Sequence, residues 1–209
     1  YFQMQLQVLK SESNNASQGL AIPWRDDLLE KKLTLLPFEL TAAQKRSLDE
    51  ILQDMKAPTH MNRLLQGDVG SGKTVVAGLA MYATYTAGLQ SALMVPTEIL
   101  AEQHFDSLSQ LFPELRIILL TGGMKPTERR QALEAIEAGQ VDMIVGTHAL
   151  IQESVTYHQL GLVIIDEQHR FGVGQRRILR EKGNNPDVLM MTATPIPRTL
   201  AITAFGDMD

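Results

Sequence analysis

The sequence predicts an α/β fold in which a mostly parallel β-sheet carries helices on both faces. Two observations support this prediction. Short apolar segments alternate along the chain with segments of helical composition, as strands do when crossover helices join them. A glycine-rich loop follows the first of the central apolar segments and precedes a helical one, as in sheets that bind a ligand beyond the carboxyl ends of their strands.

The N-terminal region is predicted to lie outside the folded domain. Residues 1–3 read YFQ and are interpreted as the remnant of a cleavable expression tag. Residues 4–32 are assigned to a linker or arm, because residues 4–20 are polar and contain SESNNASQG, although regular structure is expected to begin near Trp24. The domain is then residues 33–209. The chain stops just after an apolar helix-like segment, which indicates a piece of a longer protein.

Helices are predicted where apolar residues recur at helical spacing. Leu48, Ile51, Leu52 and Met55 form one such face after Thr41, which predicts an amphipathic helix of about four turns. The further helical segments are residues 73–87, 98–112, 126–138 and 174–182. On the second of these, one face consists of Leu100, His104, Leu108 and Leu111. The third begins at Pro126 and is followed by Gly139, as expected at the two ends of a helix.

Six short apolar segments are predicted to be strands: residues 61–66, 91–96, 115–121, 141–147, 161–167 and 187–194. A short motif follows or ends each of them, in the order GDVGSGKT, PTE, TGG, GTH, DEQH and TATP. Because the carboxyl ends of parallel strands share one edge of a sheet, these motifs are expected to line a common active edge.

The composition limits the function classes. A chain of 209 residues with 44% apolar and 21% charged residues suggests one globular domain. No segment approaches the roughly 18 apolar residues of a membrane span, and no secretory signal opens the chain. Cysteine is absent, which excludes disulfides and thiolate metal sites and fits a reducing cytosol. The net charge of −5 implies that any contact with nucleic acid is local or shared with other domains.

The glycine-rich loop has the pattern of a phosphate-binding loop. Residues 67–74 match G-x-x-x-x-G-K-[ST] through Gly67, Gly72, Lys73 and Thr74, and Gly70 and Ser71 lie within the same candidate nucleotide-binding loop. Glycines allow successive N–H groups to face phosphate oxygens at a helix N-terminus. Lys73 is expected to neutralise the β- and γ-phosphates, and the Thr74 hydroxyl to bind Mg²⁺. The pattern therefore predicts ATP and Mg²⁺ as cofactors.

Two carboxylates end the fifth apolar segment. Asp166 is the candidate magnesium ligand, and Glu167 is the candidate general base that activates water. The alternative is a zinc or iron site built from His169 and both carboxylates. It is disfavoured because the segment has neither a second histidine at helical spacing nor a cysteine.

The ordered motifs resemble those of superfamily 2 helicases. These motifs are GDVGSGKT, VPTEILAEQH, TGG, GTHAL, VIIDEQHRFGVGQR and TATPIPRTL. Within that superfamily, DEQHRFGV followed by TATPIPRT resembles the bacterial RecG family of branched-DNA helicases. The resemblance covers residues 33–209 and implies the first RecA-like lobe of the motor, a P-loop NTPase domain. Transcription-repair coupling translocases are similar in the same motifs, but Gln168 favours the RecG family.

The resemblance also implies roles near the nucleotide. Gln44 matches the position that reads the adenine edge, but Thr41 and Gln44 also form a capping-box pattern, and both roles remain open. Phe38 is implied to stack on the base, with a core residue as the alternative. Coupling of hydrolysis to movement is implied for His169, Thr192 and Thr194, and the alternative is ordinary hydrogen bonding between adjacent strand ends.

Contacts with the DNA backbone are implied for Thr97, Gly122, Gly123, Thr147, His148 and Arg170. Short hydroxyls and N–H groups contact phosphates without reading sequence, but each of these residues could instead be a cap or turn residue, and for Thr97 a helix cap is favoured. Residues 168–182 hold five basic residues against one acidic residue, Glu181. This basic run has two interpretations, a solvated helix face or a surface for DNA or another domain.

The leading hypothesis is an ATP-driven DNA helicase lobe that remodels branched DNA, such as replication forks and Holliday junctions, in recombination and repair. A second motor lobe and a DNA-binding wedge domain are its implied partners; a monomer without membrane association is expected. A P-loop phosphotransferase is the alternative from another class, but it would not need the TATP segment. A third hypothesis is an inert interaction module, which the intact Lys73, Asp166 and Glu167 argue against.

Overall fold

The computed structural model describes residues 4–8, 21–57, 62–67, 72–152, 155–166 and 186–192. In these ranges the strands are β1 (Met4–Val8), β2 (Asn62–Gly67), β3 (Gln90–Met94), β4 (Ile117–Leu120), β5 (Met143–Gly146), β6 (Leu160–Asp166) and β7 (Asp187–Thr192). The helices are α1 (Asp26–Leu35), α2 (Ala42–Lys56), α3 (Lys73–Thr86), α4 (Glu98–Leu111), α5 (Pro126–Glu137) and the short 3₁₀ helix η2 (His148–Ile151).

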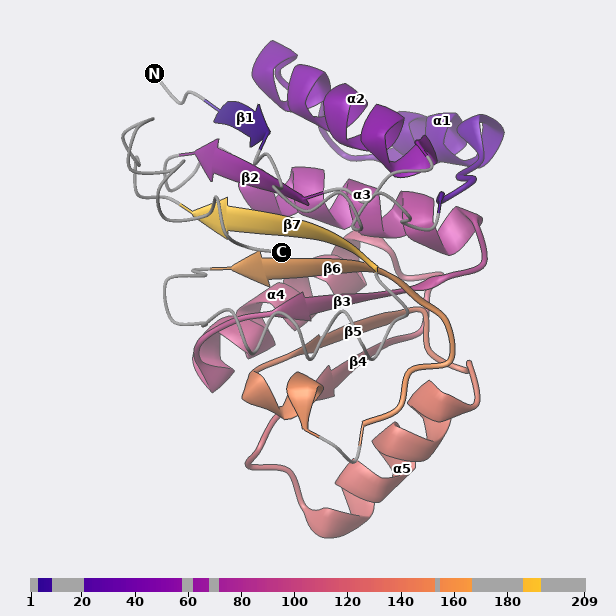
Figure 1. The fold of residues 1–209 in the computed structure, drawn as a ribbon, viewed down its shortest axis with the longest axis vertical. Coiled ribbons are helices and arrows are strands. Elements are labelled where there is room, and N and C mark those ends of the chain that lie inside the picture. The colour runs from indigo at the N-terminus through magenta and orange to yellow at the C-terminus, as the bar shows by residue number, and fades with distance from the viewer. Residues whose placement is uncertain are drawn as a thin grey trace, which may run out of the picture.

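The strands form one sheet in the order β1-β2-β7-β6-β3-β5-β4. Every neighbouring pair from β2 to β4 is parallel, and the arrows of β2, β7 and β6 point the same way in Figure 1. The predicted α/β fold and its six parallel strands are therefore confirmed. Four of the five predicted helices are confirmed as well, and the fifth, residues 174–182, lies outside the described residues.

The prediction that residues 4–32 form a linker or arm is wrong for two segments. Met4–Val8 is strand β1, which pairs antiparallel with β2 so that Met4 lies opposite Gly67. Its sequence, MQLQV, alternates apolar and polar residues, which is the period of a strand. Helix α1 begins at Asp26, which confirms the expectation of regular structure near Trp24, but it crosses the predicted domain boundary at residue 33.

The segment before α1 is anchored to α2. Ile22 and Trp24 are buried, the Ile22 N–H donates to the Met55 carbonyl at 2.6 Å, and Trp24 Nε1 donates to the Leu52 carbonyl at 2.8 Å. Lys56 Nζ lies 4.0 Å from the centroid of the Trp24 ring, within the range of a cation–π interaction. Residues 21–35 are thus part of the folded domain.

Each face of the sheet has its own apolar core. Leu162 and Ile164 of β6 pack in one core together with residues of α1, α2, α3 and α4. Val163 and Ile165 pack in the other core, with residues of α5 and η2. Successive residues of a strand point to opposite faces, and all of β6 is buried, as expected for a parallel sheet covered on both faces. No helix in the described ranges combines the length and apolar character of a membrane span.

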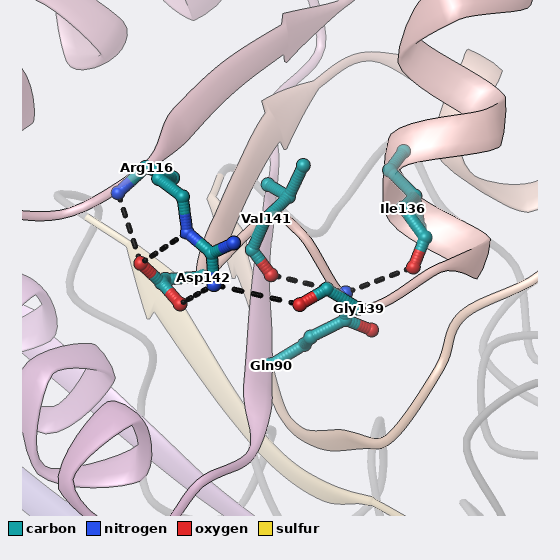
Figure 2. A network of polar contacts seen from close by, with 6 residues as sticks. All are labelled: Gln90, Arg116, Ile136, Gly139, Val141 and Asp142. Carbon is teal, nitrogen blue, oxygen red and sulfur yellow. Dashed lines mark hydrogen bonds and ion pairs between the residues drawn. The ribbon is translucent and has the colours of Figure 1, made fainter.

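One buried glutamine, Gln90, connects several chain segments at the amino-terminal edge of the sheet through hydrogen bonds (Figure 2). Its amide nitrogen donates to the carbonyls of Ile136 and Val141, both at 3.0 Å. Its amide oxygen accepts from the N–H groups of His158 at 2.8 Å and Gln159 at 3.3 Å. Gln90 thereby satisfies backbone groups in the last turn of α5, in the connection from α5 to β5 and in the connection that leads into β6. This edge is structural, and it lies opposite the edge where the predicted motifs fall.

An arginine–carboxylate pair supports the same edge. Arg116 Nη2 lies 3.0 Å from Asp142 Oδ1, and the Arg116 N–H donates to Asp142 Oδ2 at 2.9 Å. The hydrogen bond to Asp142 raises the pKa of Arg116 above its usual value. The pair joins the chain entering β4 to the chain entering β5 (Figure 2).

Replacing Gln90 by leucine is expected to destabilise the protein by about 3 kcal/mol, because buried backbone groups left without a partner cost roughly 1–3 kcal/mol each. Urea denaturation followed by circular dichroism measures the change. Gln159→Leu is the control, since its side chain is exposed and surface substitutions stay within about 0.5 kcal/mol. Equal stability of the two variants would contradict the role given to the Gln90 amide.

Candidate functional site

The carboxyl ends of β2, β7 and β6 meet at one edge of the sheet. The register pairs Gln66 with Thr192 and Asp166 with Met191, so these three strands end at nearly the same level. Helix α3 leads back to the start of β3, and its first residue, Lys73, therefore lies at the carboxyl edge. The structure thus brings Lys73, Thr192 and Asp166 to the same edge.

The N-cap residue of α3, Gly72, has a backbone conformation that favours glycine. Gly72 has φ 84° and ψ 26°, in the left-handed region that favours glycine. A Cβ at Gly72 would lie 1.8 Å from Gln44 Nε2, so the Gln44 amide occupies the space beside this turn. Lys73 and Thr74 follow as the first two residues of the helix and are partly buried. The N-terminus of α3, which carries partial positive charge, thus presents Lys73 and Thr74 together.

Gln44 forms the predicted capping box and also lies beside the phosphate loop. The Gln44 N–H donates to Thr41 Oγ1 at 3.1 Å, and the Thr41 N–H donates to Gln44 Oε1 at 2.8 Å, which confirms the capping box. The same side chain lies against Gly72 of the phosphate loop, and reading of adenine stays a prediction. Phe38 is 39% exposed, so its alternative assignment to the core is wrong, and stacking on a base stays a prediction.

The candidate magnesium ligand has a partner that the sequence did not predict. Asp166 ends β6 and is 8% exposed, and its Oδ2 lies 3.1 Å from Nε2 of His104 in α4. An ionised carboxylate can only accept hydrogen bonds, so the imidazole donates from Nε2. The available signal was a single histidine among the leucines of that helix face, but nothing in the sequence identified its acceptor.

Asp166 and Thr74 fit a magnesium ion bound together with a nucleotide. Mg²⁺ prefers oxygen ligands, and in nucleotide sites one or two carboxylates, substrate phosphates and water hold it. Asp166 supplies a mostly buried carboxylate at the strand edge, and Thr74 supplies a hydroxyl at the start of α3. Within the described residues, no three histidine or carboxylate side chains gather into a metal-binding group.

The candidate DNA-contact residues fall on the other half of the same edge. Thr97 follows β3, Thr147 and His148 follow β5, and Gly122 and Gly123 follow β4. These three strands lie side by side in the order β3-β5-β4. The carboxyl edge therefore has two halves. The nucleotide half is formed by β2, β7 and β6 and holds the candidate nucleotide-binding residues. The DNA half is formed by β3, β5 and β4 and holds the candidate DNA-contact residues.

Thr97 and Gly123 both hydrogen-bond to residues in the first turn of α4. Thr97 is the N-cap of α4, and its Oγ1 accepts from the Leu100 N–H at 3.2 Å, so the cap predicted as its alternative role is confirmed. The Gly123 N–H donates to Glu98 Oε1 at 3.0 Å. A carboxylate of α4 therefore accepts this N–H, and contact of Gly123 with a phosphate stays a prediction. The bond ties the loop after β4 to the first turn of α4.

Several predicted site residues lie outside the described residues. They are Gly70 and Ser71 of the phosphate loop, Glu167, His169, Arg170 and the rest of the basic run, and Thr194. Gly67 is the last residue of β2, and Thr192 is the last residue of β7 and is 4% exposed. The roles given to all of these residues stay predictions.

The chain is similar to helicases in sequence. Residues 41–202 match the family model of the DEAD/DEAH box helicase. A protein of Streptococcus pneumoniae serotype 4 named "ATP-dependent DNA helicase RecG" is 70% identical over all 209 residues of this chain. A protein of the same name from Staphylococcus aureus is 57% identical over the same length. The chain spans 31% and 30% of the length of these two relatives.

Solved structures agree with the sequence relatives. A structure described as RecG bound to a three-way DNA junction has a TM-score of 0.80 and 48% sequence identity, over 91% of this chain and 26% of that one. The UvsW helicase of bacteriophage T4 has a TM-score of 0.63 at 18% identity, over 88% of this chain and 67% of that one, which concerns the fold alone. The fold is that of a RecA-like α/β helicase domain.

Proposed function

The chain belongs to the DEAD/DEAH box helicase family, and from this we propose that it is the ATP-binding lobe of a bacterial DNA helicase that remodels branched DNA. The two relatives named above carry the name of an ATP-dependent DNA helicase, and the similar RecG structure is bound to a three-way DNA junction. These relatives are longer than this chain. The proposal therefore concerns a full-length protein in which this lobe is one part.

The convergence of strand ends is the observation that carries the proposal. β7 lies between β2 and β6, so the helix that starts at Lys73 and the carboxylate of Asp166 flank one short stretch of the edge. In the proposed mechanism, Lys73 and the N–H groups of the phosphate loop bind the phosphates of ATP. Thr74 and Asp166 hold Mg²⁺, which neutralises charge on the phosphates when it is bound. Glu167, next to Asp166 in sequence, accepts the proton of the attacking water.

The other half of the edge is proposed to contact the DNA backbone. Thr97, Gly122, Thr147 and His148 offer hydroxyl, amide and imidazole groups, and such contacts position a protein on DNA without reading its sequence. A protein that acts on junctions needs recognition of this kind. Hydrolysis is proposed to alternate the grip on DNA between this lobe and a second motor lobe, with a wedge domain at the junction. We place the full-length protein in the bacterial cytoplasm, as a monomer.

The full-length protein is expected to hydrolyse ATP faster with forked or four-way DNA than with linear DNA or none, in an assay of phosphate release. The 209-residue chain alone is expected to be at least about 1,000-fold slower, because the arginine finger of a second lobe contributes roughly 10³–10⁵-fold. Helicase-like turnover by the isolated chain, stimulated by branched DNA, would show that no second lobe is needed. A phosphorylated acceptor in place of free phosphate would favour the phosphotransferase alternative.

A further inference from the structure

We propose that His104 is a positioning residue that orients the Asp166 carboxylate for the magnesium of bound ATP. The inference rests on the proposed function, because it assumes that Asp166 belongs to the magnesium site. It adds a residue from α4, a helix from which the mechanism above uses only the N-cap residue, Thr97. Through His104, α4 joins the DNA half of the edge to the nucleotide half.

The contact between the two side chains has the form of an outer-shell hydrogen bond. His104 Nε2 and Asp166 Oδ2 are 3.1 Å apart, and the side chains are 13% and 11% exposed, so water competes little for either group. Donation to Oδ2 fixes the rotation of the carboxylate and leaves Oδ1 for the magnesium shell. Ligating carboxylates are commonly held by hydrogen bonds of this kind, which set their orientation and strengthen metal binding.

Helix α4 is placed to carry this contact to the DNA half of the edge. Thr97 caps its N-terminus, and Glu98 in its first turn accepts a hydrogen bond from the Gly123 N–H. His104 lies seven residues beyond Thr97, which is about two turns or roughly 10 Å along the axis. Ala101 and Leu108, on either side of His104, are fully buried in the core. The same helix therefore bonds to the DNA half of the edge at its first turn and to Asp166 about two turns later.

The proposal is tested by the magnesium dependence of nucleotide binding in the full-length protein. His104→Leu removes the donor. In His104→Asn the amide nitrogen corresponds to Nδ1, so the side chain ends short of Asp166. In His104→Gln the amide nitrogen comes near the place of Nε2 and keeps a donor. Gln110→Leu, at an exposed position of the same helix, is the matched control.

The readout is the Mg²⁺ concentration that gives half-maximal binding of a fluorescent ATP analogue, together with the affinity of the analogue in EDTA. His104→Leu and His104→Asn are expected to raise the half-maximal Mg²⁺ concentration by roughly 10- to 100-fold, as loss of outer-shell partners does. His104→Gln is expected to restore it to nearly the wild-type value, and Gln110→Leu to leave it unchanged. Affinity in EDTA is expected to stay the same in all four variants.

A merely structural role for His104 would give a different pattern. Thermal unfolding would then shift while the Mg²⁺ requirement stayed constant, and that result overturns the proposal. An unchanged or lower Mg²⁺ requirement in His104→Asn overturns it as well, and this variant decides the question if His104→Leu does not fold. If the wild-type protein binds the analogue without any dependence on Mg²⁺, the proposed function itself fails.

The link through α4 has its own measurement. Forked DNA at saturating concentration is expected to change the half-maximal Mg²⁺ concentration of the wild-type protein, because coupling between two binding sites is reciprocal. In His104→Asn that change is expected to be lost. The link between the two halves of the edge is overturned if forked DNA changes the half-maximal Mg²⁺ concentration of His104→Asn as much as that of the wild type. It is also overturned if forked DNA does not change this concentration in the wild type.

Discussion

Replacement of Lys73 by alanine is expected to weaken the binding of Mg²⁺·ATP by at least about 100-fold. Lys73 is the first residue of α3, directly after Gly72, where a lysine reaches the β- and γ-phosphates of a nucleotide in the phosphate loop. Charged hydrogen bonds contribute roughly 1.5–3 kcal/mol each, and 1.4 kcal/mol is about tenfold in affinity. Loss of two such contacts gives the expected effect, which isothermal titration with ATP and Mg²⁺ measures.

Lys31→Ala is the control for this prediction, because Lys31 lies on α1 and is exposed. Its affinity for ATP is expected to equal that of the wild type. Both variants are expected to unfold at the wild-type temperature, since neither lysine belongs to the buried core. If Lys73→Ala bound ATP within threefold of the wild type, Lys73 would not contact the phosphates, and the assignment of the loop would fail.

Replacement of Glu167 by glutamine is expected to leave ATP binding intact and to slow hydrolysis by roughly 10²–10⁴-fold, the contribution of a positioned general base. Glu167 directly follows Asp166, which ends β6 at the carboxyl edge. Glutamine has a similar size but cannot accept a proton from water at neutral pH. The measurement is kcat for phosphate release by the full-length protein with branched DNA, together with ATP affinity.

Glu137→Gln serves as the matched control, since Glu137 is exposed at the end of α5. It is expected to hydrolyse ATP at the wild-type rate. Normal turnover by Glu167→Gln would show that another group activates the water. Loss of ATP binding in the same variant would instead indicate that Glu167 helps to hold the nucleotide.

Local patterns in the sequence predicted the parallel strands and four of the helices within a few residues. The glycine pattern after β2, the capping box at Thr41 and the proline at the start of α5 each act over a few residues, so they can be recognised without the rest of the fold. The strand β1 was not predicted because it is only five residues long and is formed by pairing with β2, more than 50 residues away in sequence. Regular structure was expected near Trp24, where α1 begins, but its place in the domain was not predicted because Trp24 is anchored through contacts with α2.

The sequence by itself determined the family motifs and predicted the phosphate loop and the residue types for magnesium, because these depend on local spacing. The tertiary structure decided that β7 separates β2 from β6 and that the active edge has two halves. It also paired Gly123 with Glu98 across 25 residues and Asp166 with His104 across 62 residues. Such pairs depend on which strands become neighbours and how a helix packs across them. Those arrangements follow from burial of the whole core, and no short stretch of sequence specifies them.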